Sequence, residues 1–311
     1  MDDFNLGVPV AFLVFNRPDC TLRVFERIRQ ARPKKLLVVA DGPRPDRSDD
    51  REKCNSVRKI IIEGLDWQCE VLRNFSEENL GCGKRVSSGL DWVFSQVEEA
   101  IILEDDCLPR LAFFRFCQEL LEKYRCDSRI GQICGNLRVG EEVQRNTSYF
   151  FSKYGPIWGW ASWRRAWVKY DFNMASWPLA KQLHSLDGVI TSKLERRWRE
   201  DLYDQLFKGQ IETWDFQWGF TKLSQSMLSI IPKVNLVENI GFNSGGVHNA
   251  EMCGAANKSH EISFPLIHPT FILPDAEFDG KFSSHFSPTL MRRICSKGRA
   301  LIGRLSNWLL S

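Results

Sequence analysis

The chain has 311 residues, of which 43% are hydrophobic and 26% are charged, as is ordinary for a soluble globular protein built around one large domain. The net charge of +3 argues against bulk binding of nucleic acid. No stretch approaches the roughly 20 apolar residues that span a bilayer. The N-terminus lacks the basic and apolar regions of a secretory signal, so we expect a cytoplasmic protein with reduced cysteines.

The first hundred residues predict four strands that alternate with three helices. Short apolar runs that indicate buried strands occupy residues 8–15, 35–42, 69–75 and 100–104. Segments of helical character occupy residues 18–33, 47–63 and 84–97. This alternation predicts an α/β fold with a mostly parallel sheet and helices on both faces, whose ligands bind at the carboxyl ends of the strands.

Three adjacent acids end the fourth predicted strand. Glu104, Asp105 and Asp106 follow an apolar run directly, at the edge of the sheet where ligands are expected. Neighbouring carboxylates repel one another, and hard cations such as Mg²⁺ and Mn²⁺ take carboxylate oxygens. Since Mg²⁺ often binds one or two carboxylates together with substrate phosphates, this pattern favours a site for a metal ion and a nucleoside diphosphate over a solvated turn.

The second half of the chain has a less regular pattern. We expect a tryptophan-rich loop at 154–177, a helix near 189–208 and a pair of strands near 227–237. The glycines of the segment 241–249 indicate a flexible loop that ends near His248.

The C-terminal tail, residues 283–311, is basic. After position 287 it carries five cations and no acid, interspersed with leucine, isoleucine and tryptophan. That composition suits an amphipathic helix lying on anionic lipid at the inner face of a membrane, and the alternative is a helix docked on the domain.

Four motifs along the chain form a recognisable series. They are FNRP (15–18), ILEDD (102–106), WGWASWRRAW (158–167) and TWDFQW (213–218). Their order and rough spacing resemble those of GT-A nucleotide-sugar glycosyltransferases, specifically the N-acetylglucosaminyltransferase I type, with Glu-Asp-Asp in the place of the D-x-D motif. The resemblance implies a GT-A domain with a nucleotide-sugar-binding half at 1–110 and an acceptor-binding half at 111–282, followed by the tail.

The resemblance also implies roles for residues that match the motifs. Asp106 would bind Mn²⁺ or Mg²⁺, and His248, in a late loop, would ligate the metal or contact a phosphate. Asp215 would be the base that deprotonates the acceptor hydroxyl, although it could also simply begin a helix packed with core tryptophans. A lone histidine is often structural, so His248 has that alternative as well.

Seven further residues are candidates for binding the nucleotide sugar. They are Arg17, Asp41, Glu104, Asp105, Lys84, Arg85 and Trp160. The first four follow from the resemblance. Lys84 and Arg85 begin a predicted helix whose N-terminus attracts phosphate, with solvated first-turn cations as the alternative. Trp160 belongs to the tryptophan-rich motif, and such rings pack on sugars but are also common in protein cores.

The predicted activity is a metal-dependent, inverting transfer of a hexosyl or N-acetylhexosaminyl group to a hydroxyl of a glycan or glycolipid. A UDP-sugar is the favoured donor. The alternatives are a sugar-nucleotide pyrophosphorylase and a non-catalytic sugar-binding or membrane-associated protein. A dinucleotide-binding oxidoreductase is disfavoured because the third glycine position of GCGKRV is Val86. A P-loop kinase is excluded because the P-loop pattern is absent.

Overall fold

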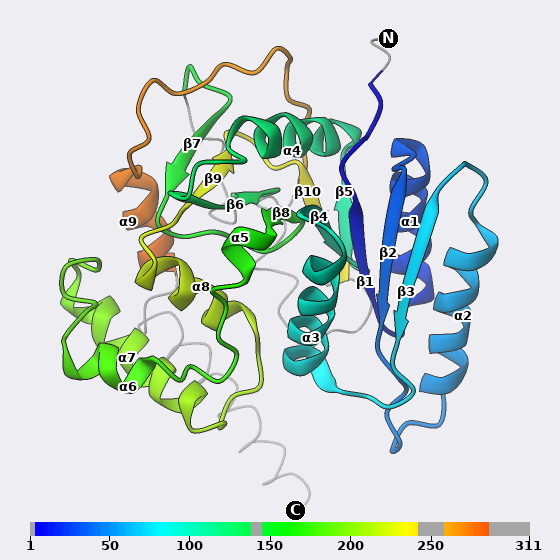
Figure 1. The fold of residues 1–311 in the computed structure, drawn as a ribbon, viewed down its shortest axis with the longest axis horizontal. Helices are drawn as coiled ribbons and strands as arrows, with labels where there is room; N and C mark the ends of the chain where they lie inside the picture. Colours follow the sequence, from blue (N-terminus) through cyan, green and yellow to red (C-terminus); the bar gives the residue numbers. More distant parts are fainter. Residues whose placement is uncertain (1–3, 138–144, 242–257, 286–311) are drawn as a thin grey trace, which may run out of the picture.

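The computed structural model describes residues 4–137, 145–241 and 258–285. An eight-stranded mixed sheet runs through the centre of the molecule in the order β3-β2-β1-β4-β8-β6-β9-β7, with helices on both faces (Figure 1). The predicted α/β class is therefore confirmed. In the part of the chain that the structure describes, no helix has the length and apolarity that crossing a membrane requires.

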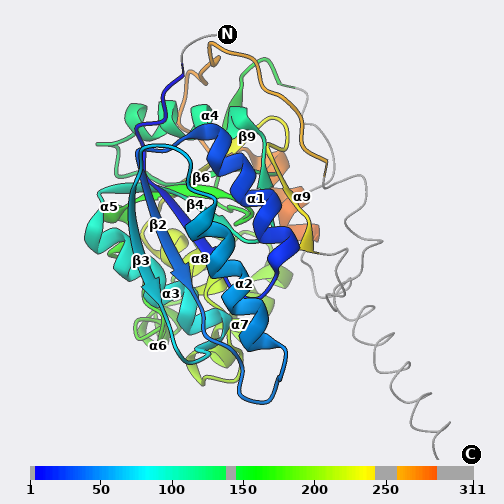
Figure 2. The same ribbon diagram turned by 90° about the vertical axis from the view of Figure 1, so that its right-hand side faces the viewer.

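The first half has the predicted alternation of strands and helices. Its elements are β1 (Val10–Val14), α1 (Pro18–Ala31), β2 (Lys35–Ala40), α2 (Asp50–Glu63), β3 (Glu70–Phe75), α3 (Gly81–Gln96) and β4 (Glu99–Glu104). The four strands are parallel, and β1 lies between β2 and β4. Figure 2 shows α1 and α2 together on one face of this sheet.

Side chains of β1 explain the two helical layers. Val10 and Phe12 pack in the core that contains buried residues of α1 and α2. Ala11 and Leu13, which point to the opposite face, pack against buried residues of α3. A strand covered on both faces is apolar at every position, which is why its run in the sequence is continuous.

The second half contains more regular structure than the sequence indicates. Its elements are β5 (Cys107–Pro109), α4 (Leu111–Lys123), β6 (Ile130–Cys134), β7 (Tyr149–Ser152), β8 (Trp160–Trp163), α5 (Arg164–Trp167), α6 (Trp177–Gln182), α7 (Lys193–Phe207), α8 (Asp215–Ser224), β9 (Leu228–Pro232), β10 (Val237–Asn239) and α9 (Ala276–His285). The sequence does not predict α4, β6 or β7. The expected helix near 189–208 corresponds to α7.

Two expectations for this half are wrong. The segment 154–177 is not a continuous loop, because β8 lies within it and pairs antiparallel with both β4 and β6. The two strands near 227–237 exist, but they do not pair with each other. Strand β9 pairs with β6 and β7, whereas β10 pairs with β5 in a separate two-stranded sheet.

Strand β8 joins the two predicted halves. Its Ala161 lies opposite Ile101 of β4, so the sheet continues from the parallel first half into the mixed second half. Trp160 and Trp163 are both buried, on opposite faces of the sheet. The side chains of this segment therefore alternate between the two faces with a period of two, as in a strand. The four closely spaced tryptophans obscure this alternation in the sequence. The tail beyond residue 285 lies outside the described residues.

Candidate functional site

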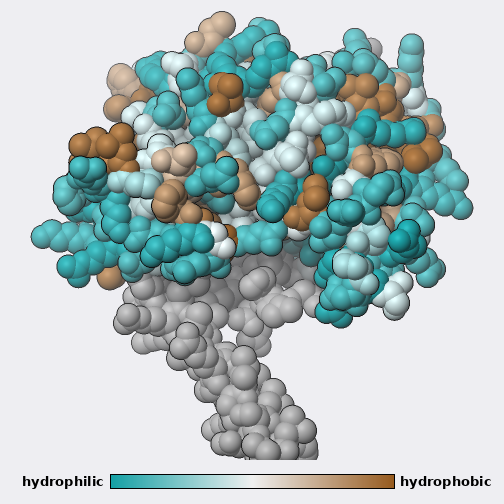
Figure 3. Space-filling model, turned by 60° about the horizontal axis from the view of Figure 1, so that its bottom comes forward, coloured by the Kyte–Doolittle hydropathy of each residue, from teal (hydrophilic) through white to brown (hydrophobic). Residues whose placement is uncertain are grey.

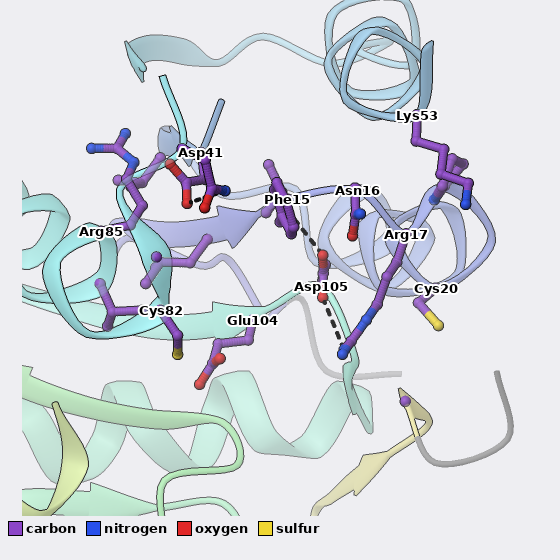
Figure 4. A pocket seen from close by; sticks show the side chains of 18 of the residues that line it. Phe15, Asn16, Arg17, Cys20, Asp41, Lys53, Cys82, Arg85, Glu104 and Asp105 are labelled. Atoms are coloured by element: carbon purple, nitrogen blue, oxygen red, sulfur yellow. Dashed lines mark hydrogen bonds and ion pairs between the residues drawn. The ribbon is translucent and has the colours of Figure 1, made fainter. Parts of the chain in front are cut away.

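A cleft of about 750 Å³ opens at the carboxyl ends of β1, β2 and β4. Its walls come from the segments that follow these strands and from the first turn of α3 (Figure 4). Pockets of roughly 300–1,000 Å³ hold cofactors and nucleotide-sized ligands. Figure 3 shows the end of the molecule at which these strands terminate, and the described residues on this surface are mostly hydrophilic. The cleft is therefore suited to a polar, charged ligand.

Two acids of the Glu104–Asp106 turn, Glu104 and Asp105, line this cleft, and Asp106 follows them without being among its lining residues. Glu104 is the last residue of β4, opposite Leu13 of β1, and Asp105 accepts a hydrogen bond of 3.1 Å from the Phe15 amide. Burial and the charges of the neighbouring acids raise the pKa of Glu104 to about 8 and that of Asp105 to about 7. When all three of its carboxylates are ionised, the turn therefore carries more negative charge than its surroundings compensate.

Arg17 partly compensates the negative charge of the acid turn. Its Nη1 lies 2.6 Å from Asp106 Oδ2 and 3.6 Å from Asp105 Oδ1. Pro18 begins α1 directly after it, so the end of β1 and the start of the helix fix the position of the arginine. Among the described residues, no cation forms an ion pair with Glu104. One guanidinium thus faces three carboxylates.

The donor set of this turn fits a hard divalent cation. Carboxylate oxygens are the ligands that Mg²⁺ and Mn²⁺ prefer, and the excess negative charge beside Arg17 would be offset by such an ion. Within the described residues, no group of three or more histidine, cysteine or acidic side chains is arranged around a common metal position. His248 lies outside the described residues, so its predicted part in the metal site is not tested.

Asp41 follows β2 and lines the same cleft. Its Oδ1 accepts hydrogen bonds from the amides of Gly42 (2.9 Å) and Leu80 (3.0 Å), and its Oδ2 accepts one from Asn79 (3.0 Å). Burial nevertheless raises the pKa of this carboxyl group. Asp41 therefore anchors the turn that leads into α3 as well as facing the cleft.

The two predicted cations of α3 have different surroundings. Arg85 is buried and lines the cleft, where its guanidinium donates to the Ala40 carbonyl (3.2 Å) and to Asn74 Oδ1 (2.8 Å). Lys84 is exposed and is not among the residues that line the cleft. The carboxylate of Glu212 lies against Gly81, at the start of this helix, where a side chain on the glycine would collide with it. The helix N-terminus that was expected to face a diphosphate thus has a protein carboxylate beside it.

Asp215 lies near the acid turn but is not among the residues that line the cleft. It is the first residue of α8, is half-buried, and accepts a hydrogen bond from the Thr213 hydroxyl. Its charge contributes to the raised pKa of Glu104. The structure thus brings Asp215 toward the acids, and also makes it part of the first turn of a helix.

Trp160 does not line the cleft. Its side chain is 1% exposed and lies in a cluster with Trp167, Trp214 and Trp218, with ring centroids 5.8–6.2 Å apart. Its indole nitrogen is buried without a hydrogen-bond partner among the described residues. The structure therefore does not bring this ring to the cleft, and its place beside the donor sugar stays a prediction. The tryptophans serve the core that supports α8.

Sequence reasoning missed a buried carboxylate that organises the cleft. Asp50, 1% exposed, binds Arg44 through Nε (2.6 Å) and Nη2 (3.0 Å), and accepts a bond of 2.7 Å from Asn16. These bonds lower the pKa of Asp50 to about 2. They tie the segment after β1 to the segment after β2. The only signal was a group of acids at the start of a predicted helix, which is common on exposed surfaces.

Comparisons with known proteins give no close relative. No protein-family model matches the chain, and no curated protein matches it either. Among solved structures, a mannosyltransferase from Pyrobaculum calidifontis, PcManGT, in complex with GDP-Man and Mn²⁺ is 16% identical, with a TM-score of 0.36 over 58% of this chain and 47% of that one. TarS residues 1–349 from S. aureus is 10% identical, with a TM-score of 0.35 over 50% and 47% of the two chains.

A third structure is similarly distant. HddC from Yersinia pseudotuberculosis is 9% identical, with a TM-score of 0.31 over 51% of this chain and 77% of that one. The matched region spans about half the length of the first two proteins. Likeness at these levels is too remote to transfer an activity or the role of any residue.

Proposed function

We propose that the cleft binds a nucleoside diphosphate sugar together with Mn²⁺ or Mg²⁺, and that the protein transfers the sugar to an acceptor hydroxyl. The observation that carries this proposal is the buried acid turn at the carboxyl end of β4, which has one arginine for three carboxylates. Strongly perturbed acids in a cleft are characteristic of functional sites. The walls of the cleft also present cations that suit phosphates, namely Arg17, Arg44, Lys53 and Arg85.

In this proposal the acid turn holds the cation and the neighbouring loops hold the nucleotide. Asp106 would ligate the metal ion, whose chemical contribution is to stabilise negative charge on the departing diphosphate. Asp105 would hold the ribose or the donor sugar. Glu104 would hold the donor sugar. Asp41 and Arg17 would contact the ribose, base or diphosphate, and Phe15, over which the Arg44 guanidinium lies at 5.4 Å, would offer a ring face to the base. The UDP preference and the hexosyl or N-acetylhexosaminyl specificity are parts of this proposal.

Asp215 would act as the base. An acceptor oxygen attacks the anomeric carbon, the bond from that carbon to the diphosphate oxygen breaks, and the hydroxyl proton passes to the Asp215 carboxylate. A single displacement of this kind inverts the anomeric configuration. The half-buried position of Asp215 at the start of α8, close enough to Glu104 to affect its pKa, supports this role.

Two further parts of the proposal concern location and acceptor. We infer a cytoplasmic protein that acts on a glycan or glycolipid, with the tail 283–311 contacting anionic membrane. Residues 286–311 lie outside the described residues, so the tail's part rests on its basic, amphipathic composition alone.

Isothermal titration tests the donor site. UDP, GDP and dTDP would be titrated with and without Mn²⁺ into the wild type, into Asp106→Ala and into the control Asp66→Ala, whose carboxylate is exposed and outside the cleft. We expect one nucleotide to bind only with Mn²⁺, with an affinity more than about tenfold weaker in Asp106→Ala and unchanged in the control. Absence of binding by all three nucleotides to the folded wild type would contradict the proposal.

A further inference from the structure

A second, smaller cavity has Asp215 in its wall. Its volume is about 110 Å³, and it is enclosed by α7, α8 and the segment 153–157 that leads toward β8. Given the share of about 30 Å³ that a water molecule takes in the liquid, the cavity has room for about four waters. It can therefore hold a small substituent of a ligand but not a second nucleotide.

Lys222 of α8 is a buried cation in the wall of this cavity. Its side chain is 1% exposed, and its ammonium group donates to Ser229 Oγ (2.8 Å) and to Gln132 Oε1. Among the described residues, no carboxylate forms an ion pair with it. An ammonium group has three N–H donors, so these two neutral acceptors leave one donor for a ligand. Burying a charge without a counter-charge is costly, which is the first indication of a missing anion.

Arg199 of α7 brings a second buried cation to the same cavity. Its Nε donates to Glu195 Oε1 at 2.8 Å, and both side chains are less than 10% exposed. The Glu195 carboxylate also accepts hydrogen bonds from the hydroxyls of Tyr154 (2.7 Å) and Ser283 (2.6 Å), so both of its oxygens have partners. Glu195 therefore balances Arg199, and it leaves the charge of Lys222 unbalanced.

The cavity is open at the middle of α8. Asp215, Gly219 and Lys222 follow one another at spacings of four and three residues, which places them on one face of the helix. A Cβ atom added to Gly219 would meet no atom within 4 Å. The aromatic rings of Trp198 and Phe216, with centroids 6.3 Å apart, form an apolar part of the lining. Aromatic rings beside cations suit a sugar that carries an acid group.

We propose that this cavity is an acceptor subsite that binds an anionic substituent, a carboxylate or a phosphate, through Lys222 and Arg199, while an acceptor hydroxyl lies at Asp215. The inference rests on the proposed function, because it takes Asp215 as the base. It adds that the acceptor is a negatively charged glycan. A bound anion would supply the counter-charge that Lys222 lacks and the acceptor for its third N–H.

Three probes and two variants test the subsite. Glucuronate, glucose 6-phosphate and glucose would be titrated into the full-length protein by saturation-transfer NMR, with Mn²⁺ and the nucleotide that binds the cleft. We expect at least one of the two anionic probes to bind at least about tenfold more tightly than glucose, and the stronger of them identifies the source as carboxylate or phosphate. Lys222→Met, which keeps the length of the side chain, should remove this preference.

Gly219→Leu keeps the test valid if Lys222→Met does not fold. The added side chain would fill the open space at α8 and should abolish binding of the anionic probe while both cations remain. Nucleotide binding to the cleft should be unchanged in this variant. Equal binding of glucose and both anions, or undiminished anion binding in folded Gly219→Leu, would overturn the subsite.

The nucleotide titration separates the two proposals. Nucleotide binding without any preference for an anionic probe would refute the subsite and leave the donor site standing. Anion binding that depends on Lys222, in a protein that binds no nucleotide, would refute the transferase and with it the acceptor role of this cavity.

Discussion

Buried carboxylates occur in two kinds of surroundings in this molecule. Asp50 and Glu195 each meet an arginine and further hydrogen-bond donors, and the pKa of each is lowered. Glu104 and Asp105 are enclosed as well, but they share one arginine with Asp106 and repel one another, and their pKa values are raised. Burial alone therefore does not distinguish a structural acid from a functional one. We propose that the incomplete set of partners at Glu104 and Asp105 marks a ligand site.

The largest effect of removing a buried acid that has a full set of partners is expected at Glu195. Glu195→Ala leaves Arg199 buried without its counter-ion, and we expect the free energy of unfolding to fall by about 3–5 kcal/mol. Urea denaturation followed by circular dichroism measures this loss. A loss below about 1 kcal/mol would show that the fully partnered acid is not structural and would break the distinction.

Asp50 adds a pH dependence of known sign. Its pKa is lowered from 3.8 to about 2, so its stabilisation is complete above about pH 4 and is lost as the pH falls toward 2. We expect Asp50→Asn to be less stable than the wild type by about 2 kcal/mol at pH 7. The difference should shrink as the pH is lowered through that window in parallel denaturation series. A difference that is constant with pH would contradict the assignment.

The acid turn should show the opposite sign. The pKa of Glu104 is raised from 4.5 to about 8, so in the absence of ligand the folded state holds its proton more tightly than the unfolded state between these values, and stability falls as the pH rises through them. Glu104→Gln removes this loss. It should nearly match the wild type at pH 4.5 and exceed its stability at pH 8.5 by at least about 1 kcal/mol, since each unit of pKa shift is worth about 1.4 kcal/mol. Wild-type stability that rises across this range would refute the interpretation.

The smallest effect is expected at an exposed pair. Glu277 and Lys281 on α9 lie 2.9 Å apart with side chains 69% and 57% exposed. Because water screens such pairs, Glu277→Ala should leave the urea midpoint unchanged within error. This variant is the matched control for Glu195→Ala, since both remove the acid of an ion pair within a helix. A large fall in the urea midpoint of this variant would mean that an ion pair stabilises the protein even where it is exposed to solvent.

The first half of the fold could be predicted because three of its four strands, β1, β2 and β4, are largely buried on both faces. Such strands appear as continuous apolar runs, and the polar residues that follow them, Arg17, Asp41 and Glu104–Asp106, necessarily meet at one edge of a parallel sheet. The strands of the second half were harder to recognise in the sequence. Strand β8 has four residues in a tryptophan-dense segment, and β6 and β7 are similarly short, so neither length nor alternation was distinctive.

The differences between the expected and the observed site have physical causes. Trp160 alternates with Ala161 on a strand, so its ring points into the core on the α3 side, where other side chains bury it. Helix α3 begins at Gly81, three residues before the expected start, and Lys84 is therefore exposed on its outer side. Arg44 and Asp50 were missed because a pair formed across a loop leaves no periodic pattern in the sequence.

Helix α8 carries Asp215 at its first position and Lys222 two turns later. Seven residues of α-helix rise about 10 Å, and a packed helix holds that length when the loops around it move. If the proton acceptor and the anion site are both on this helix, the helix fixes the distance between them. The protein's selectivity would then depend on the separation between the reacting hydroxyl and the acid group, and less on the identity of the sugar that bears them.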